Sequence, residues 1–169
     1  MLAGDGEPVF VSGLKALAQS GDGRDRIDFA GWVTGDDKLA LVYGAQVFAL
    51  PSQQENFGIA VVEALAAGVP AIVTTGVNLA PEISAAGAGW VTERDVDALA
   101  LTLRSTMSDG SERERRGRCA RRFAEQFRWS STAASLRDVY RDVLKTGRRV
   151  PVGWDSSPAN QMEERRAGL

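Results

Sequence analysis

The stretch that most constrains the fold covers residues 47–74 and reads VFALPSQQENFGIAVVEALAAGVPAIVT. Residues 47–50 are apolar and end at Pro51, a pattern typical of a strand that is buried on both faces. The polar residues 52–56 then form a loop at the carboxyl end of that strand, and residues 71–74 form a second apolar strand. With a helix between them, these strands predict an α/β fold with a parallel sheet.

The helix between these strands carries one charged side chain. Residues 57–67 are apolar or Gly except for Glu63, and Gly68 and Pro70 follow, so we expect a helix that is buried all round and ends at Gly68. A buried carboxylate is costly without a partner, and no basic residue lies within one helical turn of Glu63. We therefore expect a ligand to be that partner.

Two carboxylates flank the start of this helix. Glu55 lies in the preceding loop, Gly58 allows the backbone to approach a ligand closely, and Glu63 lies about 1.5 turns further along. In open α/β sheets, ligands bind outside the carboxyl ends of the strands, where helix N-termini present free N–H groups. Carboxylates accept hydrogen bonds from sugar hydroxyls, and the helix end attracts negative charge. A ligand with both hydroxyls and phosphates fits this combination.

The residues ENFGIAVVEALAAGVP, with Glu55 and Glu63 eight positions apart, resemble the E-x7-E element of retaining glycosyltransferase family 4, which has the GT-B fold. In this family, the region follows approximately the pattern P-S-x-x-E-x-F-G-x-x-x-x-E-A-x-A-x-G-x-P-V. The chain matches nearly every fixed position, with Ala71 in place of the final Val. One alternative is that residues 52–55 form a helix-capping box and that the protein itself satisfies Glu63.

The resemblance implies a role for each residue of this region. Glu55 would hold sugar hydroxyls and stabilise positive charge at the anomeric carbon, and Glu63 would hold the ribose. Backbone groups would contact sugar and phosphate from Asn56, Phe57, Gly58 and Ile59. Trp32 and Val33 would border the base, although packing on the core is an equal alternative for Trp32. No metal and no cofactor is expected; the ligand is a nucleotide-diphosphate sugar.

Composition narrows the remaining functions. The chain has 169 residues, 44% hydrophobic and 25% charged, as expected of one soluble globular domain. A net charge of −2 and a pI near 5.3 argue against nucleic-acid binding. A single Cys, Cys119, and the lack of His exclude an internal disulfide and the usual transition-metal ligands. The sequence has neither a transmembrane run nor a signal-peptide pattern, so we expect a cytoplasmic protein.

Local patterns predict further elements outside the central stretch. Expected strands cover residues 1–3, 27–30 and 90–92, and expected helices cover residues 8–19, 34–43, 95–107, 111–127 and a final stretch ending at residue 144. Residues 111–127 hold six arginines against three glutamates. Such a run is either a solvated helix face or a surface for an anionic membrane, so peripheral contact with the inner face of a membrane stays open.

The resemblance covers residues 1–146 and implies a doubly wound, Rossmann-like parallel sheet that forms the C-terminal, donor-binding half of a GT-B enzyme. It also implies that the first strand and helix of this half are missing, together with a basic pair that binds the diphosphate and the N-terminal acceptor domain. In a strand order of 3-2-1-4-5-6, the missing strand is the centre of the sheet. Residues 147–169 are rich in Pro, Gly and charge and are expected to be a disordered tail.

The expected function is transfer of a sugar, as in a hexosyltransferase, from a nucleotide-diphosphate sugar to an acceptor. The chain alone is expected to be inactive because the basic pair and the acceptor domain are missing. The alternative is a non-catalytic module that binds a nucleotide or nucleotide sugar, or a fragment of a split gene. A dinucleotide-dependent dehydrogenase fits poorly because no G-x-G-x-x-G follows a strand.

Overall fold

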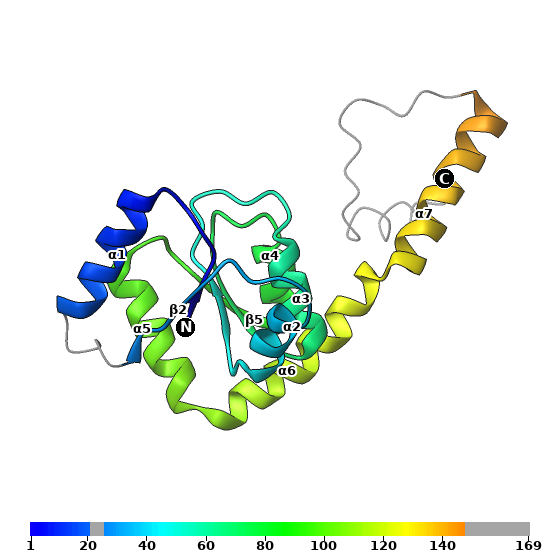
Figure 1. Ribbon diagram of the computed structural model, residues 1–169. Helices are drawn as coiled ribbons and strands as arrows, with labels where there is room; N and C mark the ends of the chain where they lie inside the picture. The colour runs from blue at the N-terminus through cyan, green and yellow to red at the C-terminus, as the bar shows by residue number, and fades with distance from the viewer. Residues whose placement is uncertain (21–25, 148–169) are drawn as a thin grey trace. The chain divides into compact units, whose positions relative to one another are not determined.

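The computed structural model describes residues 1–20 and 26–147 (Figure 1). The chain divides into two compact units, Met1–Glu125 and Gln126–Leu169. The glycine turn predicted near residues 21–23 and the predicted tail beyond Gly147 lie outside the described residues.

Strands and helices alternate along the first unit. The strands are β1 (Leu2–Ala3), β2 (Phe29–Gly31), β3 (Phe48–Leu50), β4 (Ala71–Thr74) and β5 (Gly89–Thr92). The helices are α1 (Pro8–Ser20), α2 (Gly35–Gly44), α3 (Ile59–Ala67), α4 (Ala80–Ala85), α5 (Val96–Ser108) and α6 (Gly110–Ala124). A short 3-10 helix, η2 (Glu125–Phe127), and α7 (Trp129–Thr146) follow. Most of these bounds agree with the predicted ranges to within two residues.

The paired strands are all parallel, which confirms the predicted α/β class. β1 pairs with β2, and β4 pairs with both β3 and β5. The described strands nevertheless form two sheets that are not hydrogen-bonded to each other, β1–β2 and β3–β4–β5. Figure 1 shows α1 and α5 on one side of the strands and α2, α3 and α4 on the other. The carboxyl ends of β3, β4 and β5 therefore share one edge, from which the loops to the following helices leave.

The prediction that residues 47–50 are buried on both faces is wrong. In β3, Phe48 and Leu50 are half-buried and Ala49 is exposed, whereas all four residues of the neighbouring β4 are buried. The difference has a simple cause, because β4 has a strand on each side and β3 has a strand on one side only within the described residues. A central position in the sheet, and not apolar sequence alone, decides full burial.

The core of the first unit lies around β4. Its largest fully buried side chains belong to α3, β4, the loop after β4, α4 and α5: Leu65, Ile72, Ile83, Val61, Val73, Val77, Thr74 and Thr106. In α3, the residues Val61, Ala64 and Leu65 are buried, but Ile59 and Ala66 are exposed. The prediction of a helix buried all round is therefore wrong, because α3 packs with one face only.

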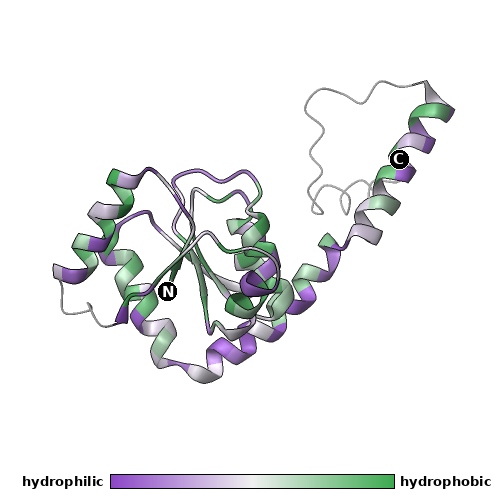
Figure 2. Ribbon diagram, in the orientation of Figure 1, coloured by the Kyte–Doolittle hydropathy of each residue, from purple (hydrophilic) through white to green (hydrophobic). Residues whose placement is uncertain are grey.

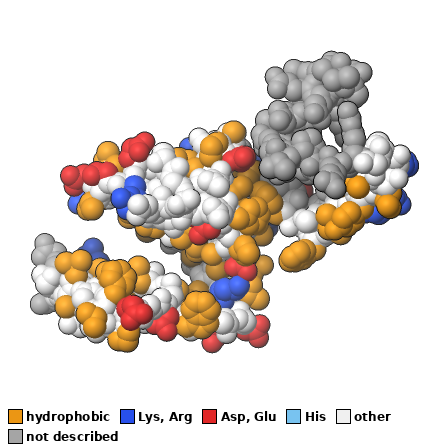
Figure 3. Space-filling model, turned by 90° about the horizontal axis from the view of Figure 1, so that it is seen from above, with side chains coloured by type: hydrophobic (Ala, Val, Ile, Leu, Met, Phe, Trp, Pro, Cys, Tyr) orange, Lys and Arg blue, Asp and Glu red, His pale blue; other side chains and the backbone are white. Residues whose placement is uncertain are grey.

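The segment before α3 packs differently. Of the residues that the structure describes, none up to Phe57 is buried, and Gly58 is the first that is. Hydrophobic residues run along α1 (Figure 2), yet Phe10 and Leu17 are 65% and 69% exposed. In the view from above, large hydrophobic side chains likewise lie openly on the surface (Figure 3). This segment forms regular elements without contributing to the core.

Helix ends follow the sequence signals closely. Gly68 adopts a left-handed conformation with φ 83° just after α3, which is the predicted glycine stop. Asp95 caps α5 by accepting hydrogen bonds from the backbone N–H groups of Asp97 and Ala98. These local signals explain why the boundaries of α3 and α5 are readable without tertiary information.

The arginines of α6 are only partly a solvated face. Arg113 donates to the carbonyls of Thr106 and Met107, both at 2.7 Å. Arg116 donates to the Gly89 carbonyl and lies over the Trp90 ring, 4.6 Å from its centroid. These arginines tie α6 to α5 and β5, so the interpretation as a simple solvated face is incomplete, and the membrane alternative stays a prediction.

An acidic residue of α6 forms ion pairs with two arginines of the same helix. Arg115 and Arg116 both bind the Glu112 carboxylate, at 2.6 and 2.7 Å. The Arg115 guanidinium, followed by that of Arg116, lowers the pKa of Glu112 from 4.5 to about 2. The carboxylate therefore stays ionised to low pH in the folded state.

The second unit is described by α7, which carries no buried residue. Within the described residues, no helix combines the length and apolar character that are needed to cross a membrane.

Candidate functional site

The candidate site lies at the carboxyl edge of β3 and β4, where the loop of residues 51–58 leads into α3. Glu55 is held in this loop by its backbone: its N–H donates to the Gly76 carbonyl at 3.0 Å, and its own carbonyl accepts from Asn78 N at 3.0 Å. Glu55 and Val77 thereby form an isolated parallel bridge. Through these bonds, Glu55 pairs with the loop after β4 in the way that a residue of one strand pairs with the neighbouring strand.

The Glu55 side chain folds back onto the start of α3. Its Oε1 atom accepts hydrogen bonds from Gly58 N at 3.1 Å and Phe57 N at 3.3 Å. Gly58 makes this turn possible because it is the residue before the helix and has φ 70°, a conformation that favours Gly. The capping box at residues 52–55 is excluded because α3 begins at Ile59, but Glu55 itself acts as a cap.

The backbone amides of this turn are partly engaged within the protein. Two of the N–H groups that were predicted to face sugar and phosphate, those of Phe57 and Gly58, already donate to Glu55. In the described part of the chain, the N–H groups of Ile59 and Ala60 have no acceptor, because the helical bonds start with Val61 and Val62 donating to the Gly58 carbonyl. The positive end of α3 therefore offers two open N–H groups beside a carboxylate that is already engaged.

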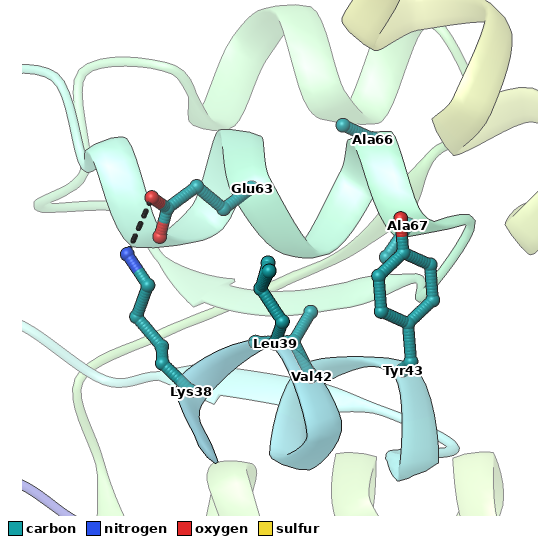
Figure 4. Close-up of a pocket in the computed structure, with 7 residues that line it drawn as sticks. All are labelled: Lys38, Leu39, Val42, Tyr43, Glu63, Ala66 and Ala67. Carbon is teal, nitrogen blue, oxygen red and sulfur yellow. Dashed lines mark hydrogen bonds and ion pairs between the residues drawn. The ribbon is translucent and has the colours of Figure 1, made fainter. Parts of the chain in front are cut away.

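Glu63 has a partner that the sequence did not predict. Lys38, in the first part of α2, places Nζ 2.7 Å from Glu63 Oε1, and the two side chains are 38% and 37% exposed. Figure 4 shows the two side chains reaching toward each other from α2 and α3. The predicted lack of a basic residue within one helical turn holds, but Lys38 reaches Glu63 from another helix, which fits the alternative that the protein itself satisfies Glu63.

The ion pair closes one end of a groove between α2 and α3. Leu39, Val42 and Tyr43 line it from α2, and Ala66 and Ala67 line it from α3 (Figure 4). An exposed pair of this kind contributes at most about 1 kcal/mol to stability. Because both side chains are partly exposed, a ligand hydroxyl can reach either of them and compete for its hydrogen bond.

The residues predicted to border the base lie between β2 and α2. Trp32 is 74% exposed and Val33 is half-buried, so the alternative in which Trp32 packs on the core is wrong. Trp32 and Val33 lie at the carboxyl end of β2, just before the helix that carries Lys38. An open indole face next to a helix N-terminus is available for stacking.

Sequence reasoning missed two parts of this arrangement. Lys38 was missed because 25 residues separate it from Glu63, and only the packing of α2 on α3 brings the two together. The loop at residues 75–78 was missed as a support for Glu55. Its Gly76 was the one available signal, since a Gly between a strand and a helix often marks a close approach of two backbones.

A comparison with known families now identifies the chain. Residues 2–123 match the family described as glycosyl transferases group 1. The chain belongs to this family.

Curated members of the glycosyl transferases group 1 family show the same relationship. The chain is 40% identical over 111 residues to the GDP-mannose-dependent alpha-(1-6)-phosphatidylinositol dimannoside mannosyltransferase of Mycobacterium tuberculosis, covering 65% of this chain and 28% of that protein. It is 33% identical over 126 residues to the D-inositol 3-phosphate glycosyltransferase of Corynebacterium kroppenstedtii, covering 73% and 28%. The chain thus spans little more than a quarter of the length of these relatives.

Solved glycosyltransferase structures share the fold. Sucrose-phosphate synthase from Thermosynechococcus elongatus superposes with a TM-score of 0.74 at 26% identity, covering 85% of this chain and 38% of that one. Anabaena HepE in complex with UDP superposes with a TM-score of 0.75 at 22% identity, covering 83% and 40%. These neighbours support the predicted GT-B type of α/β fold.

Proposed function

We propose that the chain is the donor-binding half of a retaining glycosyltransferase of family 4, which moves a sugar from a nucleotide-diphosphate sugar to an acceptor. One observation carries the proposal: the Glu55 carboxylate lies at the N-terminus of α3, 3.1 Å from Gly58 N, beside the open N–H groups of Ile59 and Ala60. A carboxylate for hydroxyls and amides for phosphate thus meet at the carboxyl edge of a parallel sheet.

Glu55 is the residue proposed to act on the sugar. Its Oε1 atom is engaged by two backbone N–H groups, while Oε2 has no partner within the described residues. Oε2 is therefore the atom that accepts from a sugar hydroxyl, and the ionised group stabilises positive charge at the anomeric carbon. The two backbone bonds keep the carboxylate oriented during the reaction.

The diphosphate is proposed to lie against the start of α3. Ile59, with its open N–H, is the strongest of the four predicted backbone contacts. Asn56, Phe57 and Gly58 line the same turn, although Phe57 N and Gly58 N reach the ligand only where Glu55 shares them. Negative charge at this position is favoured by the helix dipole.

The nucleoside is proposed to lie on the α2 side of the site. Glu63 holds the ribose hydroxyls, with Lys38 keeping its carboxylate in place, and Trp32 and Val33 border the base. GDP-mannose is the first donor to test, because the 40% identical relative is named as GDP-mannose-dependent. UDP-glucose is the comparison ligand.

Titration calorimetry of the chain with GDP, GDP-mannose, UDP and UDP-glucose tests this assignment. Glu63→Ala should weaken binding of the nucleoside diphosphate by about 1–3 kcal/mol, the range for a lost hydrogen bond to a charged group. Glu114→Ala, an exposed glutamate of α6, is the matched control and should bind as the parent chain does. Unchanged affinity in a folded Glu63→Ala chain would exclude the ribose assignment.

Glu55 requires a different readout. In a complete enzyme, Glu55→Gln should lower turnover far more than nucleotide affinity, because the charge acts mainly in the transition state. Equal losses of turnover and affinity would make Glu55 a general binding residue or only the cap of α3.

Transfer itself is proposed to need polypeptide outside the described elements. Among the described strands, β1 pairs only with β2 and β3 pairs only with β4, so each has one side without a hydrogen-bonded neighbour. Apolar parallel strands with an unpaired side favour one further strand between β1 and β3, and the acceptor domain is proposed to precede that strand. Expression of residues 1–169 alone and together with the reading frame upstream tests this. We expect transfer only in the second case, and a stable monomer that transfers sugar unaided would overturn the proposal.

The alternative is a non-catalytic module that binds the nucleotide or nucleotide sugar, or a split-gene fragment. The observation in its favour is that Lys38, a cation at the site, is already paired with Glu63. Nucleotide binding without transfer, even after the upstream polypeptide is supplied, would favour this alternative.

A further inference from the structure

We propose that Thr74 and Gly76 are positioning residues, which hold Glu55 at the start of α3 through the backbone of its loop. The inference rests on the proposed function of Glu55 at the sugar. Its starting point is that Glu55 precedes Gly58, the first buried residue among the described residues. The segment that carries Glu55 therefore has no buried side chain of its own to anchor it.

The anchor comes from the neighbouring strand. The Thr74 hydroxyl at the end of β4 donates a hydrogen bond to the Ser52 carbonyl. Two residues further on, the Gly76 carbonyl accepts from Glu55 N at 3.0 Å, and Asn78 N donates to the Glu55 carbonyl at 3.0 Å. The loop before α3 is thus fixed at Ser52 and again on both sides of Glu55.

The supporting loop is itself held by the core. Thr74 and Val77 are each 1% exposed, and Val77 N donates to the Thr74 carbonyl at 3.0 Å to close a tight turn. Thr75 N also donates to the Thr92 carbonyl at 3.1 Å, which ties the turn to β5. The well-packed part of the fold therefore determines where Glu55 lies.

Gly76 is required by space. A Cβ atom there would collide with the Gln53 carbonyl oxygen and lie 2.7 Å from the Gln53 carbonyl carbon and 3.0 Å from the Ser52 oxygen. These neighbours are backbone atoms, which cannot move away without shifting the whole loop. Any side chain at Gly76 would push the loop, and Glu55 with it, away from α3.

Thr74→Val tests the hydroxyl, because Val has the same shape and cannot donate. Its matched control is Thr92→Val: Thr92 is the register partner of Thr74 on β5, is also buried, and makes no side-chain hydrogen bond in the described part of the chain. In Thr74→Val, amide exchange measured by NMR at Glu55, Phe57 and Gly58 should become about tenfold faster, the factor expected for one lost hydrogen bond. Rates equal to those of Thr92→Val would overturn the proposal.

Ligand affinity distinguishes a residue that positions Glu55 from one that only stabilises the fold. Calorimetry with GDP and GDP-mannose, and with UDP and UDP-glucose, measures how much the sugar adds to affinity. Thr74→Val should lower that sugar contribution about three- to tenfold while leaving the affinity for the free diphosphate unchanged. Faster exchange with an unchanged sugar contribution would show that Thr74 holds the loop but does not position Glu55 for the sugar.

A second variant, with its own control, shows whether the changes come from this loop or from the whole fold. Gly76→Ala should reproduce both changes more strongly, while Gly44→Ala, where a Cβ meets no atom within 4 Å, should reproduce neither. If the parent chain binds neither the diphosphates nor their sugars, the proposed function fails. The exchange rates then still decide whether Thr74 and Gly76 hold Glu55.

Discussion

The segment up to Phe57 and the segment from Gly58 to Ala124 contain the same kinds of elements but differ completely in packing. Both hold parallel strands and α-helices. None of the described residues in the first segment is buried, whereas every residue of the hydrophobic core lies in the second. Regular secondary structure therefore does not guarantee a core, because a helix or strand needs a packed partner on its apolar face.

The division of the described strands into two sheets explains this difference. β4 is flanked by β3 and β5, and its four residues are all buried. β1 and β2 pair only with each other among the described strands, and none of their residues is buried. A two-stranded pair is marginal by itself, because stability requires three or more strands with an apolar face.

The candidate site lies on the boundary between the two segments. Glu63 belongs to the packed α3, whereas Lys38 and Trp32 belong to the unpacked segment. Under the function proposed above, the phosphate would contact the packed segment, whereas the nucleoside would also contact elements that have little burial of their own.

Hydrogen exchange should show the largest contrast between the segments. Backbone amides of α1 should exchange about three orders of magnitude faster than those of β4, because opening in a core strand costs up to the global unfolding free energy. Mass spectrometry of the chain at neutral pH measures this. Similar protection of α1 and β4 would contradict the comparison.

Truncating one leucine in each segment should give the next largest contrast. Leu65→Ala removes a side chain that is 0% exposed and should lower the free energy of unfolding by about 2–5 kcal/mol. Leu17→Ala in α1 is the matched change at a position that is 69% exposed, and it should alter stability by less than about 0.5 kcal/mol. Urea unfolding measures both values. Equal losses would mean that α1 packs in solution.

Glycine substitutions should have opposite signs in the two segments. In α6, a Cβ at Gly117 would lie 2.5 Å from the Gly68 carbonyl oxygen, so Gly117→Ala should destabilise by about 1–3 kcal/mol. In α1, a Cβ at Gly13 meets no atom within 4 Å, so Gly13→Ala should leave stability unchanged or raise it by up to about 1 kcal/mol. Thermal unfolding of both variants tests the signs, and a stabilising Gly117→Ala would exclude the close contact of α3 with α6.

Acid should have the smallest effect, confined to the packed segment. Arg115 and Arg116 hold the pKa of Glu112 near 2, below its ordinary 4.5. A lowered pKa contributes stability that is fully present above 4.5 and is lost as the pH falls toward 2. Glu112→Gln should therefore reduce the pH dependence of stability between about 5 and 2, as measured by urea unfolding. An unchanged dependence would mean that these exposed pairs contribute nothing.

Several features of the protein were readable from the sequence because short-range effects decide them. The end of α3 follows from Gly68, which alone adopts the left-handed conformation there at little cost, and the cap of α5 follows from Asp95. The parallel α/β fold and the family follow from the motif around Glu55 and Glu63 and from the alternation of elements.

Tertiary structure alone decided the surroundings of the two glutamates. Lys38 reaches Glu63 only because α2 packs beside α3, and Glu55 faces α3 only because the loop after β4 holds its backbone. Apolar sequence did not determine burial either. β3 and β4 are both apolar, but only β4 is fully buried, because among the described strands only β4 of these two has a strand on each side. Contacts between residues far apart in the chain depend on how the elements pack, and no spacing along the sequence encodes that distance.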